Sequence, residues 1–329
     1  MTKPFLIVIV GPTASGKTEL SIEVAKKFNG EIISGDSMQV YQGMDIGTAK
    51  VTTEEMEGIP HYMIDILPPD ASFSAYEFKT RAEKYIKDIT GRGKVPIIAG
   101  GTGLYIQSLL YNYAFEDESI SDDKMKQVKL KLTELEQLNN NKLHEYLASF
   151  DKESAKDIHP NNRKRVFRAI EYYLKTKKLL SSRKKVQQFT ENYDTLLIGI
   201  EMSRETLYLR INKRVDIMLG HGLFNEVKHL VEQGFEASQS MQAIGYKELV
   251  PVIKGNISME SAVEKLKQHS RQYAKRQLTW FKNKMNVHWL NKERMSLQMM
   301  LDEITTQINK RSSNHDCKRK HPRPSTREL

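Results

Sequence analysis

The stretch "GPTASGKT", residues 11–18, decides the fold because it has the form of a phosphate-binding loop. It satisfies the pattern G-x-x-x-x-G-K-[ST] at every fixed position. The six residues before it, "FLIVIV", are apolar and mostly β-branched, which is typical of a buried parallel strand. The residues after it, "TELSIEVAKKF", place apolar side chains at helical spacing. Strand, glycine-rich loop and helix in this order form the context that the motif requires.

The loop offers several kinds of group to a phosphate. Its glycines let backbone N–H groups point at an anion, and the helix that follows adds partial positive charge at its N-terminus. Lys17 supplies a full charge, and the Thr18 hydroxyl can ligate Mg²⁺, the cofactor that we expect. The predicted phosphate site comprises the whole loop: Gly11, Pro12, Thr13, Ala14, Ser15, Gly16, Lys17 and Thr18.

The composition narrows the class of protein. The chain has 329 residues, 51 Lys and Arg against 41 Asp and Glu, and a formal charge of +10, which favours a polyanionic partner. Its one cysteine, Cys317, excludes a disulfide framework within the chain. The chain enters its first strand without a signal peptide and has no apolar run of about 18 residues. We therefore expect a cytoplasmic protein that does not associate with membranes.

The first third of the chain alternates strands with helices. Short apolar runs predict strands at residues 31–34, 61–66 and 95–100, and the capping box "SAYE" predicts a helix from residue 75 to about Gly91. This alternation predicts an α/β fold with a doubly wound parallel sheet, like that of P-loop NTPases. Ligands of such sheets lie beyond the carboxyl ends of the strands. The phosphate-binding loop, "GDSMQ" (35–39) and "GGTG" (100–103) should therefore converge on one crevice.

Changes in composition indicate three parts. Residues 1–115 and 193–310 form the predicted α/β core with C-terminal helices, including helices that end at Gly220 and Lys284. Residues 116–192 are densely charged and helical in pattern, and we interpret them as an inserted helical domain. Residues 311–329 form a basic tail without aromatic residues, for which we predict disorder.

A phosphate-binding loop alone leaves an NTPase, a small-molecule kinase and other diphosphate-handling enzymes open. The surrounding residues narrow the choice. Asp36 places a carboxylate at the crevice, and Ser37 and Gln39 add polar groups suited to a flat heterocycle. The second glycine turn supplies a hydroxyl at Thr102. Arg210 and Arg214 are spaced i, i+4 on one helix face.

At this point the chain resembles the bacterial tRNA dimethylallyltransferases. The motifs that carry the resemblance are "GPTASGKT", "SGDSMQVYQGMDIGTAK", "IIAGGTGLY", "HPNNRKRVFRAIE", "QAIGYKE" and "RQYAKRQLTWF". The resemblance implies transfer of a dimethylallyl group from dimethylallyl diphosphate to the N6 amine of the adenosine 3′ of the anticodon, mainly in tRNAs reading codons that begin with U. It matches weakly around residues 116–126, and the tail lacks the cysteines of a zinc finger. We also expect a monomer.

The resemblance assigns roles to the residues already singled out. It implies that the loop holds the diphosphate of the allyl donor, with Arg214, or else Arg210, across the site. Asp36 is then the base that removes the amine proton, and Thr102 lies near the reacting groups. The residues predicted to bind tRNA are Asp36, Ser37, Met38, Gln39, Thr102, Lys124, Lys164, Arg165 and Arg168.

Three rival interpretations stay open on the sequence. A phosphoryl-transferring kinase or NTPase would bind a nucleotide and would make Asp65, near the end of the predicted third strand, important. An adenylate isopentenyltransferase would act on free nucleotides. It would need neither the charged insertion nor the excess of basic over acidic residues. A non-catalytic RNA-binding module would have no use for an intact phosphate-binding loop beside Asp36.

Overall fold

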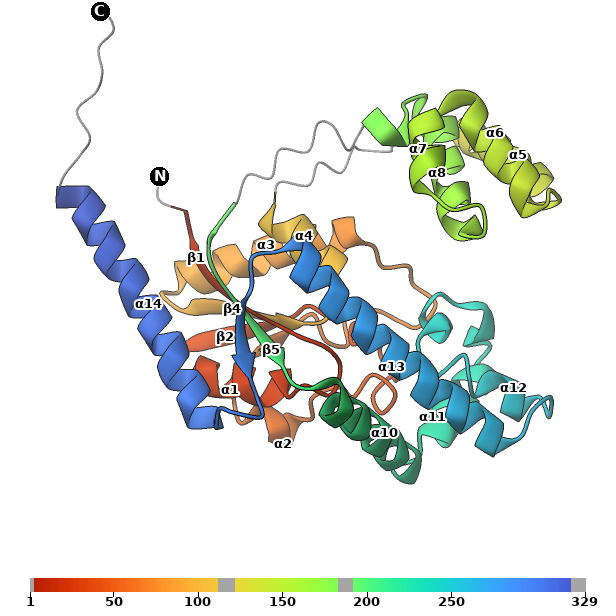
Figure 1. Ribbon diagram of the computed structural model, residues 1–329. Helices are drawn as coiled ribbons and strands as arrows, with labels where there is room; N and C mark the ends of the chain where they lie inside the picture. The colour runs from red at the N-terminus through yellow and green to blue at the C-terminus, as the bar shows by residue number, and fades with distance from the viewer. Residues whose placement is uncertain (1–2, 112–121, 183–191, 321–329) are drawn as a thin grey trace, which may run out of the picture. The chain divides into compact units, whose positions relative to one another are not determined.

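The structure, a computed structural model, describes residues 3–111, 122–182 and 192–320. The chain divides into two compact units (Figure 1). The first contains Met1–Leu110 and Glu191–Leu329, and the second contains Tyr111–Thr190. The predicted division between residues 115 and 116 falls outside the described residues, as do 183–191 of the predicted insertion.

A parallel sheet forms the centre of the first unit. Its strands are β1 (Phe5–Val10), β2 (Gly30–Ser34), β3 (His61–Tyr62), β4 (Val95–Gly100), β5 (Asp194–Glu201) and β6 (His288–Asn291). They lie in the order β3-β2-β4-β1-β5-β6, and every pair of neighbours is parallel. β1 lies between β4 and β5 and is buried on both faces, which explains its unbroken apolar sequence.

Helices cover both faces of this sheet. The N-terminal helices are α1 (Lys17–Lys27), α2 (Thr53–Met56), α3 (Ala75–Gly91) and α4 (Gly103–Leu110). On one face Ile7 and Ile9 of β1 pack in a core with residues of α1 and of the last helix, α14 (Leu297–Lys320). α3 and α4 pack together through the stacked rings of Phe78 and Tyr105, whose centroids are 4.8 Å apart. The α/β fold predicted from the sequence is confirmed.

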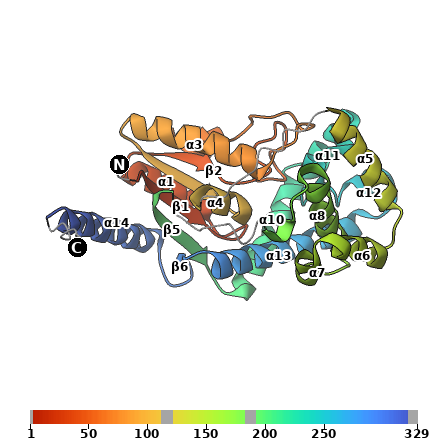
Figure 2. The same cartoon turned by 90° about the horizontal axis from the view of Figure 1, so that it is seen from above.

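The segment after β5 is helical and includes the longest helix among the described residues. It contains α10 (Arg204–Gly220), α11 (Leu223–Glu232), the 3-10 turns η1 (Phe235–Ala237) and η2 (Ser240–Gln242), α12 (Val250–Ile253) and α13 (Met259–Lys284). α10 and α13 pack against each other through a small core of Leu207, Ile211 and Ala274. Figure 2 shows α10 and α13 at one end of the sheet, away from α14.

Most strands and helices lie where the sequence predicts them, and β3 is the exception. The prediction of a strand over 61–66 was wrong, because β3 contains only His61 and Tyr62. Met63 and Asp65 have positive φ angles of 66° and 54°, which turn the backbone out of the extended conformation.

The C-terminal helix also differs from the prediction. At this end of the chain, α14 continues to Lys320 and so includes residues 311–320 of the predicted tail. Residues 321–329 lie outside the described part.

The second unit is helical in its described residues. It contains α5 (Asp122–Glu136), α6 (Asn140–Phe150), α7 (Lys152–Asp157) and α8 (Arg163–Thr176). Its core includes Leu135, Leu143, Leu147, Val166 and Ile170, which come from α5, α6 and α8. It therefore has a hydrophobic core of its own. In neither unit do the described residues include a helix long and apolar enough to cross a membrane.

A buried carboxylate ties β2 to the residues that follow α3. Glu31 of β2 is 1% exposed and accepts two hydrogen bonds of 2.6 Å from the Arg92 guanidinium. Lys94 and the Tyr62 hydroxyl donate to the same carboxylate, each at 2.7 Å. These bonds, led by those from Arg92, lower the pKa of Glu31 to about 2. A carboxyl with a lowered folded-state pKa stabilises the fold above its unfolded pKa, and this contribution is lost as the pH falls.

We expect Glu31→Gln to lower the free energy of unfolding at pH 7 by about 1.5–3 kcal/mol, because it removes charge-assisted hydrogen bonds. Urea titrations between pH 7 and pH 3 should show the difference from the unsubstituted protein shrinking as pH falls below the ordinary value of 4.5. Glu23→Gln, which removes an exposed partner of Lys26, is the control and should change stability by less than about 0.5 kcal/mol. A deficit that does not change with pH would contradict the prediction.

Candidate active site

A cavity of about 380 Å³ lies beyond the carboxyl ends of the central strands. It is lined from the phosphate-binding loop by Thr13 and Lys17, from the segment after β2 by Asp36, and from the end of β4 by Gly100. The predicted convergence of the three loops on one crevice is therefore confirmed. Four lining residues are cationic and one is acidic: Lys17, Arg214, Lys247, Arg276 and Asp36. An anionic ligand suits this balance.

The phosphate-binding loop has the strained backbone of an anion nest. Ala14 and Gly16 have positive φ angles of 63° and 93°. Such left-handed residues turn successive N–H groups toward one side, where an anion can bind. Thr13, Lys17 and Thr18 line the cavity, whereas Gly11, Pro12, Ala14, Ser15 and Gly16 form the loop behind them.

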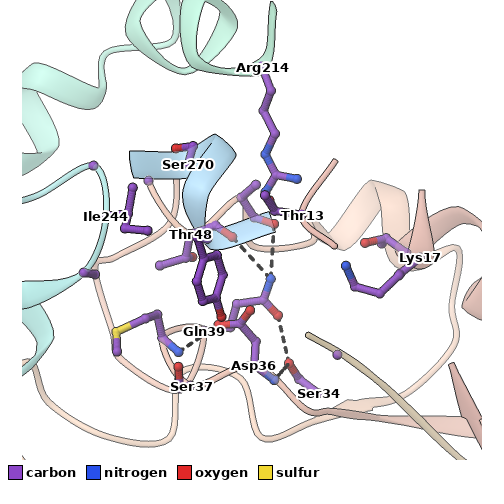
Figure 3. Close-up of a pocket in the computed structure, with 18 of the residues that line it drawn as sticks. Thr13, Lys17, Ser34, Asp36, Ser37, Gln39, Thr48, Arg214, Ile244 and Ser270 are labelled. Carbon is purple, nitrogen blue, oxygen red and sulfur yellow. Dashed lines mark hydrogen bonds between the residues drawn. The ribbon is translucent and has the colours of Figure 1, made fainter. Parts of the chain in front are cut away.

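Lys17 and Arg214 are two buried cations in the same cavity. Figure 3 shows Lys17, Asp36 and Arg214 pointing into it from α1, from the segment after β2 and from α10. Burial, followed by the charge of Arg214, lowers the pKa of Lys17 to about 8, and Asp36 acts against this shift. Burial also lowers the pKa of Arg214. The Lys17 ammonium donates to the Pro12 carbonyl oxygen at 2.8 Å.

Arg210 takes a different position, although it lies one turn from Arg214 on α10. Its Nε donates to the carbonyl oxygen of Ala14 at 2.8 Å, and it is absent from the residues that line the cavity. Arg210 thus braces the back of the phosphate-binding loop, while Arg214 lies inside the cavity.

Asp36 belongs to a loop that hydrogen bonds hold in place. Its carboxylate accepts from the Met38 N–H at 2.8 Å, and its own N–H donates to the Ser34 hydroxyl oxygen at 3.4 Å. The Gln39 amide accepts from the Ser34 hydroxyl at 2.8 Å and donates to the Ala49 carbonyl oxygen at 3.2 Å (Figure 3). Gln39 therefore connects the Asp36 loop to residues 48–49. Ser37 and Met38 also line the cavity.

Glu226 of α11 fixes the segment to which Gln39 is tied. Its carboxylate accepts from the backbone N–H groups of Asp45, Ile46 and Gly47 at 2.9, 2.8 and 3.1 Å. It also accepts from the buried hydroxyl of Tyr246 at 2.6 Å. Residues 47–49, which line the cavity, are thus held in place by a helix that is distant in sequence.

Thr102 lies next to the cavity, in the turn after β4. Its backbone N–H donates to the Gly35 carbonyl oxygen at 3.3 Å, which links the turn to the segment before Asp36. Its hydroxyl oxygen is buried, and it interacts with the Tyr273 hydroxyl, which lines the cavity.

The predicted tRNA-binding cations lie in the second unit, as a separate group. Lys164, Arg165 and Arg168 are exposed on α8, on the face opposite its buried Val166 and Ala169. Lys124 is half-buried on α5. Arg163 differs from its neighbours, because its guanidinium donates to the carbonyl oxygens of Leu138 and Glu136 at 2.7 and 2.6 Å.

The oxygen ligands near the phosphate-binding loop suit a hard cation. Within the described part of the chain, no group of three or more His, Cys, Asp or Glu residues could hold a metal ion. The Thr18 hydroxyl and the Asp36 carboxylate nevertheless line the same cavity. Mg²⁺ is commonly bound by one or two protein oxygens together with phosphate oxygens and waters, and these residues fit that pattern.

Several lining residues were not predicted from the sequence. Ile244, Gly245 and Lys247 belong to "QAIGYKE", and Tyr273, Arg276 and Gln277 to "RQYAKRQLTWF". Both motifs contributed to the resemblance, but none of these six residues was among the predicted site residues. Burial raises the pKa of the Tyr273 hydroxyl to about 12, so this phenol stays protonated.

Comparison with known proteins places the chain in a family. The model of the IPP transferase family matches residues 39–284. A curated tRNA dimethylallyltransferase of Staphylococcus epidermidis is 98% identical over 329 residues, covering 100% of this chain and 99% of the relative. The tRNA dimethylallyltransferase of Staphylococcus haemolyticus is 78% identical, again over 100% of this chain and 99% of the relative.

Solved structures agree with the sequence comparisons. The tRNA isopentenylpyrophosphate transferase of Bacillus halodurans is 41% identical and has a TM-score of 0.73, covering 97% of this chain and 100% of its own. A eukaryotic dimethylallyltransferase described as acting on tRNA is 34% identical, with a TM-score of 0.75 and coverage of 88% and 74%. The chain belongs to the IPP transferase family and shares the fold of its tRNA-modifying prenyltransferases.

Proposed function

We propose that this protein transfers a dimethylallyl group from dimethylallyl diphosphate to the N6 amine of the adenosine 3′ of the anticodon, mainly in tRNAs that read codons beginning with U. Diphosphate is released. The observation that carries the proposal is the shared cavity in which a phosphate-binding loop, a buried arginine and one carboxylate meet. Family membership and the names of the relatives support it.

The loop and the two cations suit the leaving group. When the allylic C–O bond breaks, its electron pair moves to the diphosphate and negative charge grows on the departing oxygens. Lys17, Arg214 and the backbone N–H groups of the nest bind this charge more strongly in the transition state than in the ground state. Mg²⁺ held by Thr18 and the phosphate oxygens would supply further charge neutralisation.

Asp36 suits the acceptor side of the reaction. The new bond forms between the adenine N6 and the allyl C1, and the amine must lose one proton. Asp36 is the acidic residue among those that line the cavity, so it is the group to receive that proton. Because Met38 and Ser34 fix the Asp36 loop, the carboxylate is held in place at the cavity. Positioned bases contribute about 10²- to 10⁴-fold to rates.

The acceptor adenine has to leave the RNA stack to enter a cavity of this kind. A nucleotide in a loop is already partly unstacked, so extruding it costs a few kcal/mol or less. Ser37, Met38 and Thr102 lie in or beside the cavity, where they can contact such a base. The exposed cations of α8 can contact the phosphates of the anticodon stem-loop.

The proposal is tested by supplying the purified protein with labelled dimethylallyl diphosphate, Mg²⁺ and either unmodified tRNA or AMP. Label in tRNA at the adenosine 3′ of the anticodon is the expected outcome. Label in AMP alone would replace the proposal with an adenylate isopentenyltransferase, and hydrolysis of ATP without allyl transfer would replace it with an NTPase.

Asp36→Asn is expected to lower kcat by at least about 10²-fold, because the amide keeps the shape of the side chain but cannot take the proton. Binding of dimethylallyl diphosphate, measured by calorimetry, should change little. Asp88→Asn, which alters an exposed carboxylate on α3, is the matched control and should leave kcat unchanged. Turnover of Asp36→Asn within twofold of the unsubstituted enzyme would remove Asp36 from the mechanism.

The pKa of Lys17, lowered to about 8, predicts how donor capture depends on pH. The ammonium exists below this pKa and is lost above it, so kcat/KM for the donor should be flat below pH 8 and fall above it. The decline in kcat should come at higher pH, since bound diphosphate favours the charged lysine. In Lys17→Arg, whose guanidinium does not titrate, the decline of kcat/KM near pH 8 should disappear. An unchanged decline in that variant would assign it to another group.

Replacing Lys164, Arg165 and Arg168 together by Ala should raise KM for tRNA without changing kcat. The slope of log KM against log salt should become shallower by about 1 for each phosphate that the variant no longer neutralises. KM for dimethylallyl diphosphate serves as the internal control. Lys26→Ala removes a cation from the first unit and should leave the salt slope unchanged. An unaltered salt slope in the triple variant would show that these cations do not contact RNA.

A further inference from the structure

Gln277, in the middle of α13, bridges two loops of the candidate active site. Its Oε1 accepts from the backbone N–H of Thr13 at 2.9 Å, and its Nε2 donates to the carbonyl oxygen of Gly101 at 3.0 Å. The side chain is 6% exposed and lines the cavity. One amide thus connects the phosphate-binding loop to the turn that contains Thr102.

Two glycines let α13 approach that turn closely. A Cβ atom at Gly101 would lie 2.1 Å from the Gln277 Nε2, and one at Gly103 would lie 2.2 Å from the Trp280 Cδ1. Both distances are shorter than real contacts, so a side chain at Gly101 would displace the Gln277 amide and one at Gly103 would displace the Trp280 ring. Gln277 and Trp280 are spaced i, i+3 and therefore share one face of α13. The turn around Thr102 is shaped by this face of the helix.

Thr102 is held from both sides as a result. The residue before it is tied to Gln277 through the Gly101 carbonyl, and its own N–H donates to the Gly35 carbonyl oxygen at 3.3 Å. Gly35 in turn precedes Asp36. The Thr102 hydroxyl is buried beside the cavity, where it interacts with the Tyr273 hydroxyl.

We propose that Gln277 is a positioning residue: its amide sets the distance between the diphosphate held by the loop and the reacting groups near Thr102 and Asp36. The proposal rests on the proposed function, because it concerns the same reaction. Gln277 does not take part in the chemistry. It acts by holding the phosphate-binding loop at a fixed distance from the residues near the acceptor amine. Its loss should therefore lower kcat more than it weakens binding of either substrate.

The position requires both halves of an amide. The Thr13 N–H needs an acceptor and the Gly101 carbonyl needs a donor, and the Gln277 side chain offers one of each. A methionine of similar length offers neither strongly. An ionised glutamate keeps the acceptor but places a second oxygen against the Gly101 carbonyl. A protonated glutamate restores both bonds, since it has one O–H donor and one carbonyl acceptor.

The test compares Gln277→Met, Gln277→Glu and the control Gln107→Met, which removes another buried amide from a helix without touching the cavity. For Gln277→Met, kcat for allyl transfer should fall by about 10²-fold, the loss that a misplacement of about 1 Å can cause. The Kd of inorganic pyrophosphate, measured by calorimetry with no allyl donor, should change by less than about threefold. Gln107→Met should keep kcat within twofold of the unsubstituted enzyme.

Gln277→Glu supplies the decisive measurement. The ratio of its kcat to that of the unsubstituted enzyme should rise at least tenfold as the pH falls from 8 to 5.5, while the ratio for Gln277→Met stays flat. The other titratable groups that line the cavity, including Lys17, Asp36, Arg214 and Tyr273, are the same in every variant, and Gln277→Met, which adds no charge, shows how far they contribute to the ratio.

The proposal is overturned if Gln277→Met keeps kcat within twofold, if Gln107→Met loses as much activity as Gln277→Met, or if the Gln277→Glu ratio does not respond to pH. A loss of pyrophosphate binding equal to the loss of kcat would also overturn it, since Gln277 would then be part of the diphosphate site. If the unsubstituted enzyme transfers no label to tRNA, the proposed function fails, and the positioning proposal falls with it for that separate reason.

Discussion

Two cations buried in one cavity need negative charge close by, and the other features of the site follow from this need. Lys17 and Arg214 come from the two separate sequence segments of the first unit, and burial lowers the pKa of each. Removing charges from water costs several kcal/mol per ion unless an opposite charge is near. Asp36 compensates only in part, because four cationic residues line the cavity. In the proposed reaction a diphosphate supplies the missing negative charge, and the charge on its leaving oxygens rises as the C–O bond breaks, when the cations help most.

The loops of the site are held in position by hydrogen bonds from helices. The loop of Asp36 is joined through Gln39 to residues 48–49, and Glu226 of α11 binds the backbone just before them. On the other side, Gln277 of α13 bonds to the phosphate-binding loop. Loops alone sample many conformations, whereas long helices packed on a sheet do not. Sites that hold reacting groups within a fraction of an ångström depend on such support.

The sequence correctly predicted the strands and helices whose conformation depends mainly on neighbouring residues in the chain. A six-residue apolar run, a glycine loop and a capping box each determine their own conformation, so β1, α1 and α3 lie where they were expected. The third strand was mispredicted because the residue types at Met63 and Asp65 do not indicate the left-handed backbone conformations that these residues adopt. Gln277 and Glu226 act through contacts across the fold, 264 residues from Thr13 in the case of Gln277. No local pattern reveals such a partner, although the motif around Gln277 contributed to the family resemblance.

The placement of the acidic residues argues that this phosphate-binding loop serves a leaving group and not phosphoryl transfer. A kinase or NTPase of this architecture would need Asp65 beside the loop to act on Mg²⁺ and the terminal phosphate. Asp65 instead pairs with Lys50 and does not line the cavity, and Lys50 also pairs with Asp45. The carboxylate that does line it is Asp36, within a loop whose hydrogen bonds fix its position. In the proposed reaction, a base at this position can take the proton of an amine that attacks carbon. The same loop chemistry that binds nucleotides elsewhere is thus suited here to hold the diphosphate that departs.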